Sequence, residues 1–144
     1  MALRTFDPRL VNILIGGVPM QGFADGTFLS IDRDEDAFVK VVGADGTSTR
    51  IKSNNRSATL TLTLKQSSPS NDVLSGFAAL DELSNTGVVP VLVKDNSGNS
   101  IYFSATGWVQ KYPLSEFSKE ISNREWTLDL VDTDIFVGSN NENA

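Results

Sequence analysis

The residue types that most often carry catalysis are missing from this chain of 144 residues. It contains no cysteine and no histidine, which excludes thiolate nucleophiles, disulfides, imidazole bases and the commonest metal ligands. Any catalysis would have to rest on carboxylates, Lys, Tyr or Ser alone. Among 18 acidic residues, some pair always falls near the separation that glycoside hydrolysis requires, so such a pair indicates nothing. We therefore expect no catalytic residue and no enzyme.

The most suggestive spacing of acidic side chains lies in the charged segment 32–36, which has aspartate at every second position. This is the spacing of the first ligands in a calcium-binding loop. Such a loop also needs Gly at its sixth position and Glu at its twelfth, where this chain has Ala37 and Gly43. We therefore interpret the segment as a solvated turn and predict neither a metal site nor a cofactor.

A glycine-containing segment and two tryptophans are the remaining candidates for ligand binding. The segment 43–46 lacks the Lys-Ser/Thr pair and the helix of a phosphate-binding loop, so we predict a turn there. Trp108 and Trp126 would form an aromatic platform for sugars if their rings lay side by side. Tryptophans in strands more often pack in a core. A carbohydrate-binding β-sandwich therefore stays open as an alternative of a different class.

The charge balance argues against nucleic acid as a specific ligand. The formal net charge is −6, and a negative surface repels DNA. The only local excess of positive charge is Arg50, Lys52 and Arg56, which is too small for a nucleic-acid footprint. No apolar run approaches the roughly 20 residues of a membrane helix, and residues 1–7 do not resemble a signal peptide. We expect a soluble protein that is made in a cytoplasm and binds no membrane.

The elements that must position these residues are mostly strands. The segment 57–64 alternates strictly, with Ala and Leu on one face and Ser and Thr on the other, which indicates a half-buried strand. The pair Gly16-Gly17 favours a two-residue hairpin turn, because both central positions of a type I′ turn need positive φ. Other strands are expected at 10–15, 18–20, 28–32, 37–42, 88–94, 100–110 and 117–130, the last with a β-bulge near 122–123.

One amphipathic helix is expected over about 69–85. Pro69 suits its first position and Gly87 lies just past its end. Helical spacing relates the apolar residues Val73, Leu74, Phe77, Leu80 and Leu83. The whole pattern predicts a mainly β fold: an antiparallel sandwich or barrel of two packed sheets with one flanking helix. We expect a single domain over 1–144, with a polar C-terminal tail at 138–144 that frays.

The segment 43–57 is long and polar for a hairpin tip. Only Ile51 offers an apolar anchor in its interior. Long loops in compact domains are usually either functional or mobile. Contact with a partner and simple mobility both stay open at this point.

Several stretches together resemble the tail tube proteins of contractile-tailed, myovirus-type bacteriophages. The similarity extends from about residue 12 to residue 136, and no single piece of it is catalytic. It is carried by the segments 38–46, 53–57, 59–64 and 67–74.

This resemblance implies a fold shared with the tubes of type VI secretion systems. It implies hexameric rings that stack head to tail, with joined strands lining the lumen and an extended loop reaching the next ring. DNA then passes through the lumen without specific binding. The implied partners are further copies of the chain, the sheath, the tape measure protein, and the baseplate and tail terminator proteins. The implied location is the virion tail, assembled in the host cytoplasm. A tailocin or type VI-like secretion tube is the alternative of the same class.

On this interpretation the polar segments acquire expected roles. Threonines on the outer face of the strand 57–64 would tolerate an aqueous lumen, and the basic residues of 43–57 would meet the acidic segment of the next ring. The candidates for the inter-ring loop are Gly43, Asp45, Arg50, Lys52, Asn54, Asn55 and Arg56. The candidates for the acidic patch are Asp32, Asp34, Glu35 and Asp36, and those for the lumen are Thr59, Thr61 and Thr63.

Overall fold

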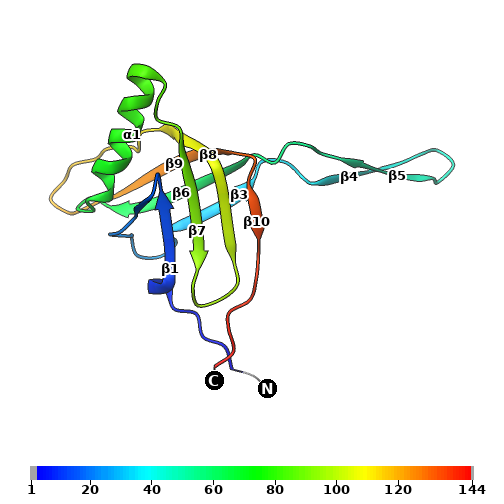
Figure 1. The fold of residues 1–144 in the computed structure, drawn as a ribbon, viewed down its shortest axis with the longest axis horizontal. Coiled ribbons are helices and arrows are strands. Elements are labelled where there is room, and N and C mark those ends of the chain that lie inside the picture. The colour runs from blue at the N-terminus through cyan, green and yellow to red at the C-terminus, as the bar shows by residue number, and fades with distance from the viewer. Residues whose placement is uncertain (1–2, 144) are drawn as a thin grey trace.

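The computed structural model of the chain describes residues 3–143, which form one sheet, one hairpin and one long helix (Figure 1). The sheet is antiparallel throughout, with strand order β2-β1-β7-β8-β9-β6-β3 and with β10 paired to β8. The first strands are β1 (Val11–Ile15), β2 (Val18–Pro19), β3 (Leu29–Arg33), β4 (Phe38–Val42) and β5 (Ser48–Lys52). The others are β6 (Ala58–Lys65), β7 (Val89–Asp95), β8 (Ile101–Lys111), β9 (Asn123–Val131) and β10 (Asp134–Phe136), with the helix α1 (Ser70–Ser84) and a short 3-10 turn (Pro8–Leu10).

The two layers of the sandwich are two halves of this one continuous sheet. Strand β8 links them, because its first part pairs with β7 and β10 and its second part pairs with β9. Figure 1 shows the half with β1 and β7 lying across the half with β3, β6 and β9, and α1 flanking the sheet. The predicted fold class, mainly β and antiparallel with one flanking helix, is confirmed.

The core lies between the two halves and follows the predicted alternation of β6. Leu60, Leu62 and Leu64 are fully buried, and Leu60 and Leu62 face Leu128 and Trp126 of β9 in register. Burying each such side chain stabilises the fold by about 1.5–3 kcal/mol. The remaining buried apolar residues of the two halves include Ile13, Ile15, Val91, Val93 and Leu130.

The predicted hairpin at Gly16-Gly17 is also confirmed. Both glycines have positive φ, 62° and 80°, and Ile15 pairs with Val18 directly across the turn. Strand β2 ends at Pro19 and forms one edge of the sheet. An edge is where a residue without an N–H group is tolerated.

Two predicted strand patterns are wrong in their details. The expected strand 117–130 begins only at Asn123, and residues 112–122 form a loop in which Phe117 and Ile121 are exposed. The irregular pairings lie instead on β8, opposite β7 and opposite β9. In β8 the sequence predicts one face that carries Ile101, Phe103, Ala105 and Val109. Ile101 and Phe103 are each 39% exposed, whereas Ser104, on the other face, is buried. The buried residues of this strand, Ser104 and Gly107, are small.

The helix agrees with its predicted range but not with its whole apolar face. Leu74 is buried, whereas Leu80 and Leu83 are 49% and 86% exposed. Figure 1 shows the C-terminal half of α1 extending past the sheet, which leaves these side chains without a neighbour to cover them. In the tail, Gly98 pairs with Asn140 and Arg4 pairs with Glu142.

The prediction that residues 43–57 form a polar loop is wrong. It contains a turn at 43–47, the strand β5 and a connecting segment at 53–57. Strands β4 and β5 form a hairpin that projects far from the body in Figure 1. We call residues 37–53 the arm. Every residue of β4 and β5 is exposed, so neither strand has a buried face. The apolar sequence of β4 still predicts a strand, whereas the mostly polar sequence of β5 does not.

Candidate assembly surfaces

The arm has two chemically different faces, which its cross-strand register defines. Phe38 pairs with Lys52 and Lys40 with Arg50, so one face carries three cations and an aromatic ring. The Arg50 guanidinium lies 4.1 Å from the centroid of the Phe38 ring, a cation–π contact. The opposite face is apolar and includes Val39, Val41 and Ile51, with exposed fractions of 50%, 47% and 54%.

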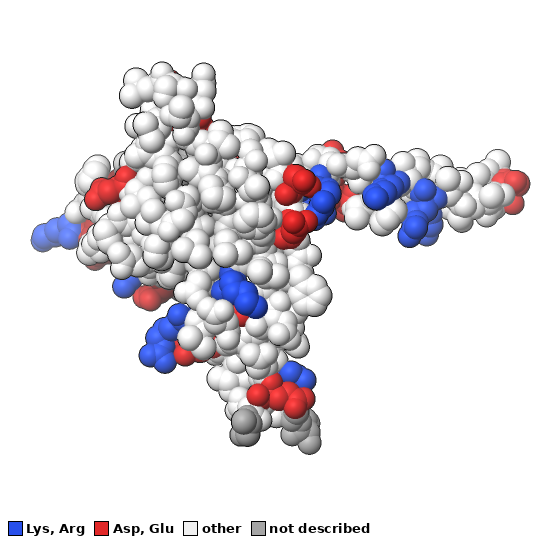
Figure 2. Space-filling model, in the orientation of Figure 1, with Lys and Arg blue, Asp and Glu red and all other residues white. Residues whose placement is uncertain are grey.

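The arm also differs in charge from the rest of the chain. Residues 37–53 contain Lys40, Arg50 and Lys52 against Asp45 alone, a net charge of +2. Because the whole chain carries −6, the remaining residues carry −8. Figure 2 shows the basic side chains along the arm and an acidic group at its tip. The arm of one copy is therefore electrostatically complementary to the body of another.

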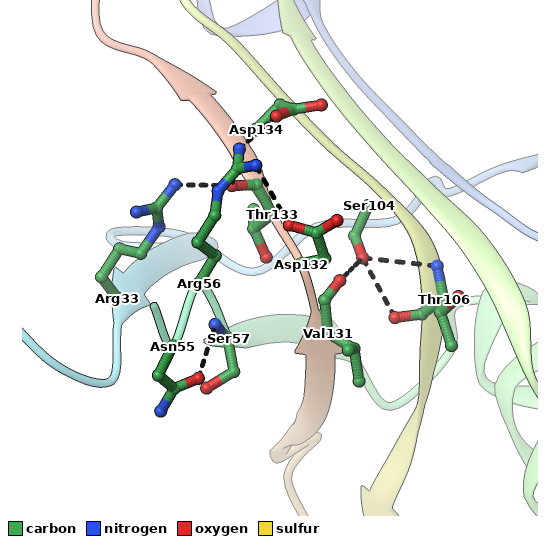
Figure 3. Close-up of polar contacts among 10 residues, drawn as sticks. All are labelled: Arg33, Asn55, Arg56, Ser57, Ser104, Thr106, Val131, Asp132, Thr133 and Asp134. Atoms are coloured by element: carbon green, nitrogen blue, oxygen red, sulfur yellow. Dashed lines mark hydrogen bonds and ion pairs between the residues drawn. The ribbon is translucent and has the colours of Figure 1, made fainter. Parts of the chain in front are cut away.

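Polar residues fix the base of the arm to the body (Figure 3). We call Arg33, Arg56, Asp132, Thr133 and Asp134 the arm-root cluster. Arg56 Nη1 lies 3.1 Å from Asp132 Oδ1, and Arg56 Nη2 contacts Asp134 Oδ1. The carbonyl oxygen of Thr133 accepts from Arg33 Nη2 at 2.5 Å and from Arg56 Nη2 at 3.3 Å. The end of β3, the segment before β6 and the β9–β10 connection therefore meet at one point.

Two atoms of the arm-root cluster are buried without a hydrogen-bond partner among the described residues. They are Arg33 Nε and Thr133 Oγ1. Leaving such a group unsatisfied costs about 1–3 kcal/mol. Asp132, next to Thr133, adopts the left-handed conformation with φ of 47°. Unpartnered buried atoms and a left-handed residue thus occur together at the base of the arm.

A second set of contacts joins the two chain segments at the root. Asp34 accepts hydrogen bonds from Ser57 Oγ at 2.7 Å and from Thr59 Oγ1 at 2.8 Å. Glu35 accepts from Ser53 Oγ at 2.9 Å. These bonds consume part of the acidic patch that the sequence assigned to the next ring.

The residues predicted to contact the next ring therefore fall into two groups, one on the arm and one at its root. Arg50 and Lys52 lie on the arm, whereas Arg56 lies at its root, where Asp132 and Asp134 neutralise its charge. Of the other candidates, Gly43 and Asp45 form the tip turn, where Asp45 Oδ1 accepts from Thr47 N at 3.0 Å. These hydrogen bonds from Thr47 lower the pKa of Asp45 below its ordinary range. Asn54 and Asn55 lie in the exposed segment between arm and root, and Asp32 and Asp36 are exposed as well.

The predicted lumen residues share a polar face that extends beyond β6. Thr59, Thr61 and Thr63 are half-buried. They lie opposite Asp129, Thr127 and Glu125 of β9, and Thr61 and Thr59 lie opposite Ser30 and Asp32 of β3. We call this the polar sheet face. Its acidic members on β9 could not be predicted from the sequence, because only the pairing of β6 with β9 places them beside the threonines.

The alternative prediction, an aromatic platform formed by Trp108 and Trp126, is wrong. Trp126 is 2% exposed, and its Nε1 donates to Asn71 Oδ1 at 2.9 Å. A buried ring cannot form a sugar-binding surface together with Trp108. Within residues 3–143, no group of three or more acidic side chains is placed to hold a metal ion, and no helix has the length and apolarity to cross a membrane.

Comparison with known proteins decides the family. The sequence profile described as Bacteriophage PhiTE tail tube protein matches residues 18–138 of the chain. The chain belongs to this family. It is also 35% identical over 144 residues to "Structural protein ORF10" of Pseudomonas phage KPP10, covering 94% of this chain and 83% of that protein. The predicted resemblance to phage tail tube proteins is confirmed, and the chain is a structural protein of a phage tail.

Solved structures confirm the fold. The cap of the anti-feeding prophage, its tube terminating cap, matches with a TM-score of 0.65 at 12% identity over 94% of this chain and 93% of that chain. A sheath/tube terminator of the extracellular contractile injection system PVC matches with a TM-score of 0.65 at 13% identity, over 95% and 100%. A chain of the PVC sheath-tube complex matches with a TM-score of 0.61 at 12% identity, over 92% and 91%.

Proposed function

We propose that the chain self-assembles into stacked hexameric rings that form the inner tube of a phage tail, the conduit for DNA ejection. The observation that carries this proposal is the arm. It projects from the body with an exposed apolar face, and it is positive where the rest of the chain is strongly negative. Such a feature is typical of a segment that packs against another molecule. Membership of the tail tube family makes a second copy of the chain the natural partner.

In the proposed tube the arm joins one ring to the next. Its apolar face packs on a neighbouring copy, while Arg50 and Lys52 approach acidic side chains such as Asp32 and Asp36. An interface between two different patches of the same chain produces an open stack when the rotation between successive copies does not close into a ring. The tip residues Gly43 and Asp45 and the adjoining Asn54 and Asn55 would add polar contacts.

The polar sheet face is the proposed lining of the lumen. It combines Thr59, Thr61 and Thr63 with the acidic neighbours Glu125 and Asp129 of β9. A negative, hydroxyl-rich wall repels the phosphate backbone and offers no cluster of Lys or Arg to release counterions. DNA would then pass without being retained.

The proposed partners and location follow from the tube role. The sheath would surround the tube, the tape measure protein would occupy the lumen before ejection, and baseplate and terminator proteins would bound it. The chain would act in the virion tail after assembly in the host cytoplasm, without enzyme activity. A tailocin or secretion tube would use the same assembly, but the matching family and curated relative both come from phages.

Negative-stain electron microscopy of the purified protein at low and raised concentration tests this proposal. We expect rings at low concentration and long hollow tubes at high concentration. Some tubes need a nucleus, so the test is repeated with the baseplate and tape measure proteins. A chain that stays monomeric under all these conditions would contradict the proposal.

A further inference from the structure

Two exposed patches lie at opposite ends of strand β9. The loop 112–122 precedes the strand, and the arm-root cluster follows it. At about 3.3 Å per residue, the nine residues of β9 place these ends roughly 30 Å apart. Figure 1 shows the loop on the side of the molecule away from the arm.

The loop 112–122 presents three large apolar side chains to solvent. Leu114, Phe117 and Ile121 are 76%, 81% and 69% exposed. The acidic residues Glu116 and Glu120 lie between them and are exposed as well. A concentration of apolar side chains on so short a segment is unusual for a surface that meets only water.

Contacts from Arg124 at the start of β9 fix the position of this loop. Arg124 is buried at 7% exposure, and it donates to Glu116 O at 3.1 Å and to Ser122 Oγ at 2.6 Å. Its guanidinium also lies 5.3 Å from the centroid of the Phe117 ring. The apolar side chains are therefore displayed on a positioned backbone, which lowers the entropy cost of binding.

A pocket of complementary chemistry lies beside the arm-root cluster. It encloses about 270 Å³ and is lined by Arg33, Arg56, Asp134 and the apolar residues Ile101, Phe103, Ile135 and Phe136. Arg33 forms no ion pair among the described residues, and its buried Nε has no hydrogen-bond partner. Phe136 is 59% exposed. The pocket thus offers an apolar wall and, in Arg33, an arginine with no ion pair to another described residue, while the two arginines and two aspartates of the arm-root cluster balance in formal charge.

We propose that the loop 112–122 of one copy packs into the arm-root pocket of a second copy. Phe117 and its apolar neighbours would cover Phe103 and Phe136, and Glu116 or Glu120 would pair with Arg33. This proposal rests on the proposed self-assembly and names its lateral contact. Because the two patches differ and lie at opposite ends of β9, the contact is head to tail and can close a ring of copies.

Crosslinking of the cysteine-free chain tests the contact. Ser115→Cys places a thiol beside the apolar loop residues, and Val137→Cys places one beside Phe136. With a short bismaleimide, we expect the double variant to form covalent trimers and larger species under assembly conditions. Each single variant should stay largely uncrosslinked. Dimers alone would indicate a two-fold contact and would overturn the proposal, as would the absence of crosslinks in assembled material.

A matched pair of charge substitutions separates the contact from assembly in general. Leu114→Asp should reduce the yield of rings at least tenfold, whereas Leu83→Asp should leave it unchanged, although Leu83 is still more exposed. Equal yields from the two variants would overturn the lateral contact while the tube proposal stood. If the parent protein formed no assembly even with its tail partners, both proposals would fall.

Discussion

Arg56 illustrates how a single side chain can direct a long projecting element. Its guanidinium contacts Asp132 and Asp134, and its backbone carbonyl accepts from Thr133 N at 2.9 Å. These contacts join the segment after the arm to the β9–β10 connection. The direction of the arm is therefore set at its base, where a small rotation would move the tip by a large distance.

Arg56→Ala should loosen the arm without unfolding the body. Since the ion pairs are partly exposed, we expect the free energy of unfolding to fall by only about 1–2 kcal/mol. Spin labels at Thr47→Cys and Glu125→Cys report the distance between arm tip and body. The distribution should be narrow in the parent and broad in the variant, whereas Arg9→Ala, which removes an unrelated surface pair, should not change it. An unchanged width in Arg56→Ala would contradict the role.

The tip of the arm should respond to acid. Hydrogen bonds from Thr47 lower the pKa of Asp45 below the ordinary 3.8. A lowered pKa means that the stabilising contact is present above the ordinary value and is lost as the pH falls through the folded-state pKa. The amide resonance of Thr47 should therefore titrate with a midpoint below pH 3.8. The Asp45→Asn variant serves as the control, and a midpoint above that value would contradict the bond.

At the residue scale, the sequence shows which side chains can form polar contacts, but it does not show which residues they contact. It identified Arg56 as a basic contact residue but could not show that Asp132 and Asp134, more than 70 positions away, neutralise it. It likewise could not show that Trp126 is buried against Asn71. Both outcomes depend on long-range pairing of strands, which no local pattern encodes.

At the scale of elements, strand β6 is the most constrained part of the fold. Leu62→Ala should lower the free energy of unfolding by about 2–5 kcal/mol, because it leaves a cavity at a fully buried position. The neighbouring Thr61→Ala, on the polar sheet face, should change it by no more than about 0.5 kcal/mol. Chemical denaturation of the two variants measures the difference. Similar losses would show that the assigned faces of β6 are wrong.

The arm should be needed for stacking but not for folding. Val41→Asp places a charge on its apolar face, where no other part of the same chain covers it. We expect an unchanged melting temperature within a few degrees and at least a tenfold loss of tube length. Electron microscopy and thermal denaturation measure the two effects. Tubes of normal length from this variant would show that the apolar face is not an interface.

Elements with regular or continuous apolar sequence could be predicted, whereas β5, whose sequence is mostly polar, could not. β6 and α1 show regular apolar spacing because one side of each packs on the core. Strand β5 and the loop 112–122 do not, since their apolar residues face outward. In β8, Ser104 and Gly107 lie inside, where a Cβ on Gly107 would fall 2.7 Å from Leu130 Cδ2. Strand β5 and the loop 112–122, which both departed from prediction, take part in the contacts that we propose between copies.

At the scale of the whole molecule, the chain combines a compact sheet with surfaces that are incomplete alone. The arm, the loop 112–122 and the arm-root pocket all expose apolar side chains. The polar sheet face, by contrast, suits water. The proposed tube would account for this contrast, because it would bury the apolar surfaces between copies and leave the polar sheet face along the lumen.

Cryo-electron microscopy of the assembled tubes tests the central claim most directly. The account predicts rings in which each arm crosses into the adjacent ring and in which Thr59, Thr61 and Thr63 face the lumen. A reconstruction in which the arms lie free in solvent, or in which the polar sheet face points outward, would contradict it.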